Sequence, residues 1–483
     1  MDNLPRDKEY FLNKIKMREL TVTVFGLGNV GLPMAVAFAL KGCKVIGYDI
    51  NEERVNMLNR GEHYLPHEPY MDKIQDLVKS GLFEATTDAR YAVKNSDVIL
   101  ILVPLFADEK YGIDFTSLID ASKKIGDHLE HGKLIILSTT VPPGTTEGIV
   151  KWIIEERSRL KAGKDFALAF VPERTKSGTV IDDFLRNYPI VVGGVDEKST
   201  NAIAGFYEAI VENKVIKVSS ARAAELTKLF KAVYRYFNIV LAQEYAKISE
   251  LTGVDVKEVI EAANTDPYSH VHWPGPGIGG HCIPVYPYFF DFMYSLYDRS
   301  FKLFQVSKEI DKGMPEHVVY LLFEALNEVK KTINSSKIAV LGLTFRGDVK
   351  VTYNTPAKPI IDEILRYNGN IIAHDTMLSP REIEEEFGVK GTNDLVEALT
   401  DADAVIIVTD HTAYKKLTLE DLTERMKKPA VVVDTRNLFD PSEAHQNQGK
   451  IIYRGIGRSK YLFVYPHDFF NRIREYISKK YKV

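Results

Sequence analysis

The sequence predicts an α/β protein with two Rossmann-like domains, each built on a doubly wound parallel sheet, joined by a helical central domain with one long helix. Two observations predict this architecture. A strand, a glycine-rich turn, a helix and a second strand ending on an acid begin near residue 21 and again near residue 337. Between these repeats the apolar residues recur at helical spacing. The predicted domains span 1–217, 218–330 and 331–483.

Bulk composition is that of an ordinary globular protein. Of the 483 residues, 45% are hydrophobic and 27% charged, with a formal net charge of −4, so nothing favours nucleic acid or a membrane as partner. Two cysteines make neither a disulfide framework nor a metal motif. The first 20 residues lack the apolar core of a signal peptide, and no apolar run approaches a membrane span. We therefore expect a cytoplasmic protein without a bound metal.

The first repeat has the order of elements that binds a dinucleotide. A predicted strand, Thr21–Phe25, precedes the turn Gly26-Leu27-Gly28-Asn29-Val30-Gly31 and a helix over Leu32–Leu40. A second strand, Lys44–Tyr48, ends on Asp49. A lone G-x-G-x-x-G is a weak signal, but this strand, turn, helix, strand and acid in sequence form a specific one.

Each of these residue types has a physical role in that turn. Gly26 permits the tight turn, Gly28 lets the backbone approach a pyrophosphate, and Gly31 lets the helix pack on the strand. Asp49 can accept hydrogen bonds from ribose hydroxyls, which favours NAD over NADP. Arg54 leaves the alternative open, because an arginine near the ribose could hold a 2′-phosphate.

The α/β alternation continues beyond this unit. The predicted elements are the strand Val98–Val103, the helix Phe115–Leu129, and the strands Leu134–Leu137 and Phe166–Phe170. Ser138 to Thr145 follow one strand, and Val171 to Arg174 follow the next. If the sheet is parallel, Glu173 lies on the same rim as Thr140, where active-site residues collect.

From Ser219 the pattern changes to a long helix. A serine cap at 219 or 220 and a stop at Gly253 bound a helix that runs to about Thr252. Lys228, Ala232 and Arg235 share one stripe of it, and such a stripe normally faces solvent. A second helix over 255–264 and aromatic helices over 286–329 follow, with a break at 310–315.

The loop Pro274–Pro284, PGPGIGGHCIP, delivers a His–Cys pair behind a rigid run of glycine and proline. A thiol behind such a loop, in a chain with a dinucleotide fingerprint, suggests covalent redox chemistry at Cys282. A buried cysteine that merely packs is the alternative from the loop alone.

The second repeat starts with a predicted strand, Lys337–Leu341, and a degraded glycine turn over 342–347. The remaining predicted elements are the helix Pro359–Tyr367 and the strands Asn370–Ala373, Ala404–Val408 and Ala430–Val433. Asp434-Thr435-Arg436 follows the last of them. Because its glycine turn is degraded, this domain is expected to bind a different nucleotide from the first.

These motifs in this order resemble the UDP-glucose/GDP-mannose dehydrogenase family, the nucleotide-sugar 6-dehydrogenases. The resemblance runs from about Thr21 to about Arg458 and rests on FGLGNVG, STTVPPGTTE, VPERTKSG, AELTKLF, PGPGIGGHCIP, VLGLTFRGD, VVDTRN and YRGIGR. The PGPGIGGHCIP form is most similar to the branch that acts on UDP-N-acetylhexosamines, such as UDP-N-acetyl-D-mannosamine or UDP-N-acetylglucosamine. The resemblance implies that the enzyme oxidises a sugar C6 alcohol to a carboxylate with NAD, and that the product is a precursor of polysaccharides or glycans.

The resemblance also implies roles for individual residues. The expected catalytic residues are Cys282 as nucleophile, Lys228 as stabiliser of an alkoxide, Glu173 as the group that activates water, and Thr140 as a water ligand. The expected NAD contacts are Gly26, Gly28, Asn29, Val30, Gly31, Asp49, Arg54, Pro104, Thr139 and Thr140. The expected UDP-sugar contacts are Glu173, Arg174, Lys228, Arg235, Gly275, Gly277, Gly279, Gly280, Phe345, Arg346 and Arg436. The long helix implies a homodimer.

The chain departs from the family at several positions. Ala232 stands where the family has an asparagine, Tyr286 where it has an aspartate, and Tyr353 where it has an arginine. The loop 267–273 also differs, and its histidines or His281 could supply a base. A tyrosine is a poor base at neutral pH. The departures keep two alternatives open: a UDP-glucose dehydrogenase, and a weakened paralogue that binds UDP-sugar and NAD without full turnover. A two-electron dehydrogenase of a small hydroxy acid ranks last.

Overall fold

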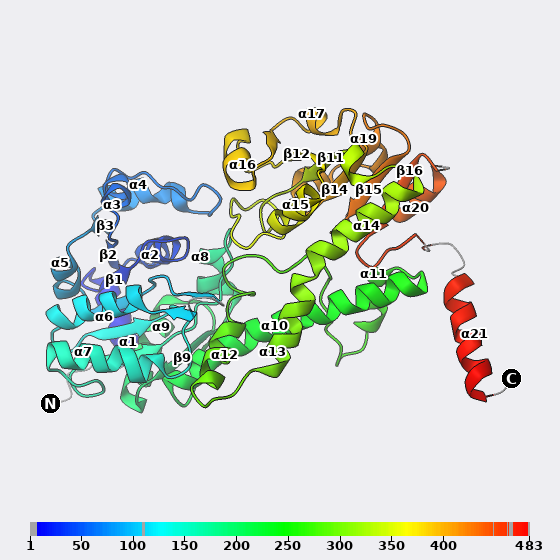
Figure 1. Ribbon diagram of the computed structural model, residues 1–483. Helices are drawn as coiled ribbons and strands as arrows, with labels where there is room; N and C mark the ends of the chain where they lie inside the picture. Colours follow the sequence, from blue (N-terminus) through cyan, green and yellow to red (C-terminus); the bar gives the residue numbers. More distant parts are fainter. Residues whose placement is uncertain (1–6, 109–111, 448, 461, 463–466, 482–483) are drawn as a thin grey trace. The chain divides into compact units, whose positions relative to one another are not determined.

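The computed structural model describes residues 7–108, 112–447, 449–460, 462 and 467–481, and these form two compact units (Figure 1). The first unit comprises Met1–Lys231 with Tyr288–Ser300, and the second comprises Ala232–Pro287 with Phe301–Val483. Each unit contains one doubly wound sheet with helices on both faces. The predicted fold class is confirmed, while the predicted domain boundaries stay predictions.

The sheet of the first unit has the strand order β10-β9-β8-β7-β4-β1-β2-β3. Its strands are β1 (Thr21–Phe25), β2 (Lys44–Tyr48), β3 (Phe83–Thr86), β4 (Val98–Ile101), β7 (Leu134–Leu137), β8 (Ala167–Phe170), β9 (Ile190–Gly194) and β10 (Val215–Lys217). A separate hairpin joins β5 (Phe106–Asp108) to β6 (Gly112–Asp114). The chain runs from β1 outward to β3 and then returns to β4 on the other side of β1, which places the switch point at the ends of β1 and β4.

Helices cover both faces of this sheet. One face packs under α1 (Lys8–Lys16), α2 (Gly31–Leu40), α8 (Val180–Asp182) and α9 (Glu197–Ile210). The other packs under α5 (Ala89–Lys94), α6 (Thr116–His128) and α7 (Lys151–Ser158). Along β4, Val98 and Leu100 belong to the first core and Ile99 and Ile101 to the second. This alternation follows from the two-residue period of a strand. The remaining helices of the unit are α3 (Glu52–Asn59) and α4 (Ile74–Lys79).

The sheet departs from the predicted parallel arrangement at one edge. β9 runs antiparallel to β8, and β10 runs parallel to β9. A parallel crossover needs a connection that carries the chain back along the sheet, usually a helix. Between β8 and β9 the chain forms only the short α8 and a π-helical turn, Asp183–Asn187, so β9 starts at the edge where β8 ends. β8 itself is parallel to β7, as the sequence predicted.

The predicted long helix is α10 (Ala221–Thr252). Its first turn is capped by the Ser220 hydroxyl oxygen, which accepts from the Ala223 N–H at 3.2 Å. Gly253, at φ +74°, follows its last residue, as expected for a helix stop. The following helices are α11 (Val256–Ala263), α12 (Pro287–Ser295), α13 (Lys302–Lys312) and α14 (Met314–Glu328), and the last two are separated at Gly313, as predicted.

The sheet of the second unit is wholly parallel, with the order β13-β12-β11-β14-β15-β16. Its strands are β11 (Lys337–Leu341), β12 (Asn370–His374), β13 (Lys390–Thr392), β14 (Ala404–Ile407), β15 (Ala430–Asp434) and β16 (Ile451–Gly455). Its helices are α15 (Ala357–Arg366), α16 (Pro380–Phe387), α17 (Leu395–Leu399), α18 (Thr412–Lys415), α19 (Leu419–Thr423), α20 (Pro441–Gln446) and α21 (His467–Tyr481). This is the strand order of a dinucleotide-binding domain.

None of the helices within the described part of the chain combines the length and the hydrophobicity needed to cross a bilayer.

Candidate active site

The glycine turn after β1 has the geometry that a dinucleotide needs. Gly26 has φ +96°, and a Cβ there would lie 2.7 Å from the Leu102 carbonyl oxygen. A Cβ at Gly31 would lie 1.8 Å from the Gly26 oxygen, so α2 can approach the turn only with glycine at this position. A Cβ at Gly28 would meet nothing within 4 Å, so this backbone is open to a ligand. The turn therefore fits the pyrophosphate of NAD at the start of α2.

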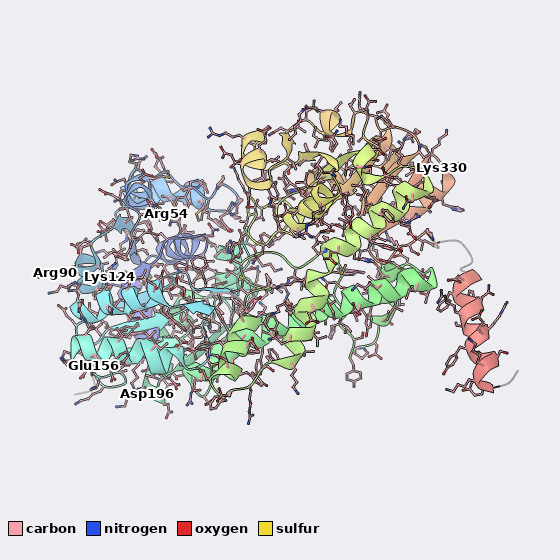
Figure 2. The ribbon with its side chains drawn as sticks, in the orientation of Figure 1. Arg54, Arg90, Lys124, Glu156, Asp196 and Lys330 are labelled. Atoms are coloured by element: carbon pink, nitrogen blue, oxygen red, sulfur yellow. The ribbon has the colours of Figure 1, made fainter. Side chains whose placement is uncertain are left out.

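Asp49 ends β2 beside this turn. One carboxylate oxygen accepts from the Leu27 N–H at 2.9 Å, and the other accepts from the Asn51 N–H at 2.9 Å. The Arg54 guanidinium, labelled in Figure 2, donates to the same carboxylate at 3.1 Å and lies over the Tyr64 ring. The Arg54 side chain is thus held by the Asp49 carboxylate and the Tyr64 ring. The ribose would therefore meet the Asp49 carboxylate, because the Arg54 cation is already paired.

A matched pair of glycine substitutions tests this assignment of the turn. Gly28→Ala is expected to fold normally and to weaken NADH binding at least roughly tenfold, because the added methyl occupies open space where backbone meets pyrophosphate. Gly31→Ala is expected to destabilise the first unit by about 2 kcal/mol or more, because its methyl overlaps a carbonyl oxygen. NADH fluorescence titration and thermal unfolding of both variants measure the two effects. Equal NADH affinity of Gly28→Ala and the parent would contradict the assignment.

The predicted rim residues Thr139 and Thr140 follow β7 directly. Thr139 is buried, and its hydroxyl donates to the Val103 carbonyl at 2.8 Å, which ties the loop after β7 to the loop after β4. Thr140 is half-buried, and Pro104 is exposed in the loop after β4. All three therefore lie at the carboxyl edge of the sheet, where the turn after β1 also lies.

Glu173 and Lys228, two of the predicted catalytic residues, are in direct polar contact. Glu173 follows β8 on the same edge, and its carboxylate lies 3.2 Å from the Lys228 ammonium, with both side chains at most 15% exposed. Lys228 also donates to the Glu173 carbonyl, and the Thr175 N–H donates to the other carboxylate oxygen. The prediction that the stripe carrying Lys228 faces solvent is therefore wrong for Lys228, which is buried, and for Ala232, but Arg235 is exposed.

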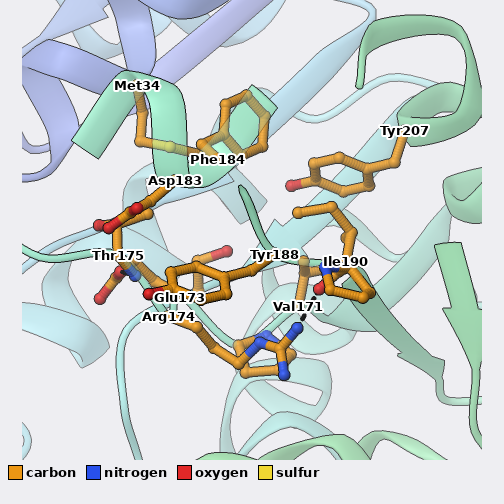
Figure 3. A pocket seen from close by; sticks show the side chains of 13 residues that line it. Met34, Val171, Glu173, Arg174, Thr175, Asp183, Phe184, Tyr188, Ile190 and Tyr207 are labelled. Atoms are coloured by element: carbon orange, nitrogen blue, oxygen red, sulfur yellow. Dashed lines mark hydrogen bonds between the residues drawn. The ribbon is translucent and has the colours of Figure 1, made fainter. Parts of the chain in front are cut away.

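A small pocket lies against Glu173 in the first unit (Figure 3). Its lining mixes polar and apolar side chains: Met34, Ser138, Val171, Pro172, Glu173, Arg174, Thr175, Asp183, Phe184, Tyr188, Pro189, Ile190 and Tyr207. Arg174, expected to contact substrate, donates to the Pro189 carbonyl, and burial lowers its pKa. The pocket lies where the loop after β8, the π-helical turn, the start of β9, α2 and α9 contribute side chains.

Glu225 is a site residue that sequence reasoning did not single out. It lies on α10 one turn before Lys228, and it is buried. Its carboxylate accepts from the Gly144 N–H and from both the N–H and hydroxyl of Thr146, at 2.6 to 2.8 Å. Burial raises its pKa to about 7 in spite of these bonds. Glu225 therefore fixes the loop after Thr140 to the helix that carries Lys228.

The Cys282 loop belongs to the second unit, where it packs against the degraded glycine turn of the second sheet. A Cβ at Gly280 would lie 2.7 Å from the Phe345 ring, and one at Gly279 would lie 2.8 Å from the Phe345 Cβ. The Gly280 N–H donates to the Tyr353 carbonyl at 3.0 Å. The predicted substrate contacts Gly279, Gly280 and Phe345 therefore come together, because only glycine lets the loop approach so closely.

Other predicted contacts lie along the same loop. A Cβ at Gly275 would lie 3.0 Å from an Arg436 guanidinium nitrogen, and one at Gly277 would lie 3.3 Å from Pro356. Arg436 donates to the Val408 carbonyl at 2.8 Å, which aims its side chain across the carboxyl ends of β14 and β15. Arg346 is exposed. The Ile278 N–H donates to Asp311 at 3.0 Å, and burial raises the pKa of Asp311 to about 6.

Cys282 is exposed, so the interpretation of a buried packing residue is wrong. Its sulfur accepts a hydrogen bond from the Tyr286 hydroxyl at 3.3 Å. His281 stacks on Tyr353, with ring centroids 4.1 Å apart and planes 9° from parallel. Tyr286 and Tyr353, which stand where the resemblance leads us to expect an aspartate and an arginine, are therefore both in contact with the His–Cys pair.

Comparison with known proteins identifies one family over most of the chain. The UDP-glucose/GDP-mannose dehydrogenase family matches in three parts: its NAD binding domain over residues 20–211, its central domain over 222–312, and its UDP binding domain over 339–441.

Similar proteins cover almost the whole chain. The UDP-N-acetyl-D-mannosamine dehydrogenase of Pyrococcus horikoshii is 33% identical over 91% of this chain and 99% of its own length. The NDP-N-acetyl-D-galactosaminuronic acid dehydrogenase of Ralstonia solanacearum is 32% identical over 87% of this chain and 96% of its own. The solved structure of the Pyrococcus horikoshii enzyme superposes with a TM-score of 0.81 at 32% identity, covering 91% of this chain and 99% of that one. The solved structure of a UDP-glucose dehydrogenase from Pyrobaculum islandicum superposes with a TM-score of 0.80 at 26% identity, covering 91% of this chain and 98% of that one. The chain thus belongs to the UDP-glucose/GDP-mannose dehydrogenase family, as an NAD-dependent UDP-sugar dehydrogenase.

Proposed function

We propose that this enzyme oxidises the C6 alcohol of a UDP-N-acetylhexosamine to the uronate through a covalent adduct on Cys282. The observation that carries the proposal is the exposed sulfur at the end of a loop packed on Phe345 and Arg436 in the UDP binding domain. UDP-N-acetyl-D-mannosamine is the first substrate to test, because the similar proteins named above include a dehydrogenase of that sugar. The product would serve polysaccharide or glycan synthesis.

The chain's own residues divide the work of two successive oxidations. When bound, NAD⁺ supplies the hydride acceptor for both. Lys228 stabilises the oxyanion as an ammonium, and the Cys282 thiolate adds to the aldehyde carbon to give a thiohemiacetal, the species from which the second hydride is lost. Glu173 deprotonates or orients the water that hydrolyses the resulting thioester, and Thr140 holds that water.

The decisive experiment measures NAD⁺ reduction against a panel of UDP-sugars, with product mass and stoichiometry recorded. The proposal expects two NADH per sugar and a uronate product, with UDP-N-acetyl-D-mannosamine or UDP-N-acetylglucosamine preferred over UDP-glucose. One NADH per sugar would reject the four-electron reaction.

A weakened paralogue is the second candidate, because Ala232 is buried where the family places an asparagine and Tyr353 stands in place of an arginine. For such a paralogue, we expect UDP-sugars and NAD⁺ to raise the melting temperature of the protein without producing NADH.

We also propose a homodimer through α10. Large apolar side chains recur along one face of this helix at spacings of three, four or seven, and they stay 41 to 62% exposed in the single chain: Phe230, Tyr234, Leu241, Tyr245 and Ile248. A contiguous apolar stripe of this kind marks an interface.

Ile248→Glu is expected to halve the mass measured by light scattering, because it places a charge within that stripe. Trp152→Glu is the matched control, since Trp152 is 63% exposed on α7 and lies outside the stripe. A dimer that persists in Ile248→Glu would contradict the proposal.

A further inference from the structure

The turn that carries Cys282 also holds the residue that contacts its sulfur. The Val285 and Tyr286 N–H groups both donate to the Cys282 carbonyl, at 3.2 and 3.0 Å, and α12 begins at the next residue, Pro287. Cys282 is exposed, whereas Tyr286 is only 9% exposed. A largely buried ring on a hydrogen-bonded turn has little freedom, so its hydroxyl is held at the 3.3 Å distance from the sulfur.

The direction of this hydrogen bond follows from the acidity of the two groups. A phenol ionises near pH 10, above the range of an ordinary thiol, so at neutral pH the proton stays on the oxygen. The tyrosine therefore donates to the sulfur and does not act as a base. A carboxylate at the same position, as in the family pattern, could only accept at neutral pH. The tyrosine thus places a hydrogen-bond donor beside the sulfur, where a carboxylate would place an acceptor.

We propose that Tyr286 is a catalytic residue that stabilises the Cys282 thiolate by donating a hydrogen bond to it, both when the sulfur attacks and when it leaves. This inference rests on the proposed covalent function. A hydrogen bond to an anion is stronger than one between neutral groups, so the bond favours the thiolate over the thiol.

The proposed steps place negative charge on sulfur twice. In the first, the thiolate forms a C–S bond, the aldehyde π electrons move to oxygen, and that oxygen takes a proton from water. In the last, water adds to the thioester carbonyl and gives its proton to a base, the C–S bond breaks, and its electron pair returns to sulfur. Tyr286 keeps its own proton in both steps, and no additional oxidant or reductant is needed.

The test measures thiolate reactivity directly, apart from turnover. Iodoacetamide alkylates thiolates, and intact mass counts the adducts. Cys43, the other cysteine, is fully buried, and burial raises its pKa to about 12, so the native adduct reports Cys282. Tyr286→Phe is expected to slow alkylation at pH 7 roughly tenfold, the factor that one lost hydrogen bond to an anion gives. The difference from the parent is expected to shrink at pH 9, where more thiolate forms in either protein.

Tyr294→Phe is the matched control, since Tyr294 lies on α12 and is 43% exposed, and its alkylation rate is expected to equal the parent's. Tyr286→Leu also removes the hydroxyl, and it replaces Tyr286→Phe if thermal unfolding shows that the latter is misfolded. Equal alkylation rates at pH 7 for the parent and a folded Tyr286 variant would overturn the inference. An alkylation rate lowered by the same factor at pH 7 and pH 9 would also overturn the inference, because it would indicate altered access of iodoacetamide to the sulfur.

Turnover separates this inference from the proposed function. Tyr286→Phe is expected to lower kcat with little change in the KM for the UDP-sugar, because the hydroxyl contacts the sulfur. If Cys282→Ala still yields two NADH per sugar, the covalent function fails, and Tyr286 loses its catalytic role even if the alkylation difference remains. If Cys282→Ala is inactive and Tyr286→Phe alkylates like the parent, only the role of Tyr286 fails.

Discussion

Replacing Cys282 by serine is expected to stop the enzyme after the first oxidation, with the overall four-electron rate reduced at least about a thousandfold. An aldehyde releases a second hydride readily only after a nucleophile has added to its carbon. A serine hydroxyl is a far weaker nucleophile at neutral pH than a thiolate. The Tyr286 hydroxyl, which contacts the exposed Cys282 sulfur, donates its hydrogen and does not serve as a general base. The NADH yield per sugar is therefore expected to fall from two to one, and the aldehyde can be trapped with a hydrazine reagent and identified by mass.

Cys43→Ala provides the control for this variant. Cys43 is fully buried in the first core cluster, so its loss costs some stability but leaves the chemistry intact. Its NADH yield is expected to stay at two per sugar. A Cys282→Ser enzyme that still produces two NADH at the parent's rate would contradict the covalent route, and attention would then turn to direct oxidation of the hydrated aldehyde.

Most strand positions could be predicted because their signal is local. β1, β2, β7 and β11 begin and end at the predicted residues, since each is a mainly apolar run that stops before a glycine, an aspartate or a serine. The glycine turn after β1 was predictable for the same reason, since the contacts that require its glycines form within one strand–turn–helix unit. The antiparallel β9 was not predicted, because strand direction depends on how the connection after β8 folds.

Site contacts between distant segments carry no local signal. Glu225 meets Gly144 and Thr146 across 79 or more positions of sequence, and charge and spacing on α10 do not reveal that a loop will need its carboxylate. Tyr286 was noted as a missing base, but its direction toward the sulfur depends on the turn that precedes α12. The burial of Lys228 likewise follows from the contact with Glu173, which charge patterning along one helix cannot show.

Replacing Lys228 by methionine is expected to lower kcat for the first oxidation by about 10² to 10³, the usual loss when one group that stabilises a developing oxyanion is removed. Methionine keeps much of the side-chain volume but carries no charge. Stopped-flow measurement of the first NADH separates this step from thioester hydrolysis. Lys247→Met is the control, because Lys247 lies on the same helix and pairs with Glu244 at the surface.

A structural role for Lys228 can be distinguished from a catalytic one by also changing its partner. In Lys228→Met, the Glu173 carboxylate stays largely buried without its cation, which is expected to cost about 3 kcal/mol of stability. The double variant Lys228→Met with Glu173→Gln removes both charges and is expected to recover most of the melting temperature, because replacing both members of a buried pair is often nearly neutral. Its kcat is expected to stay low, since neither the ammonium nor the carboxylate is present. If the double variant recovers the first-step rate together with its stability, Lys228 acts by holding the loop after β8, and the oxyanion must be stabilised by another group.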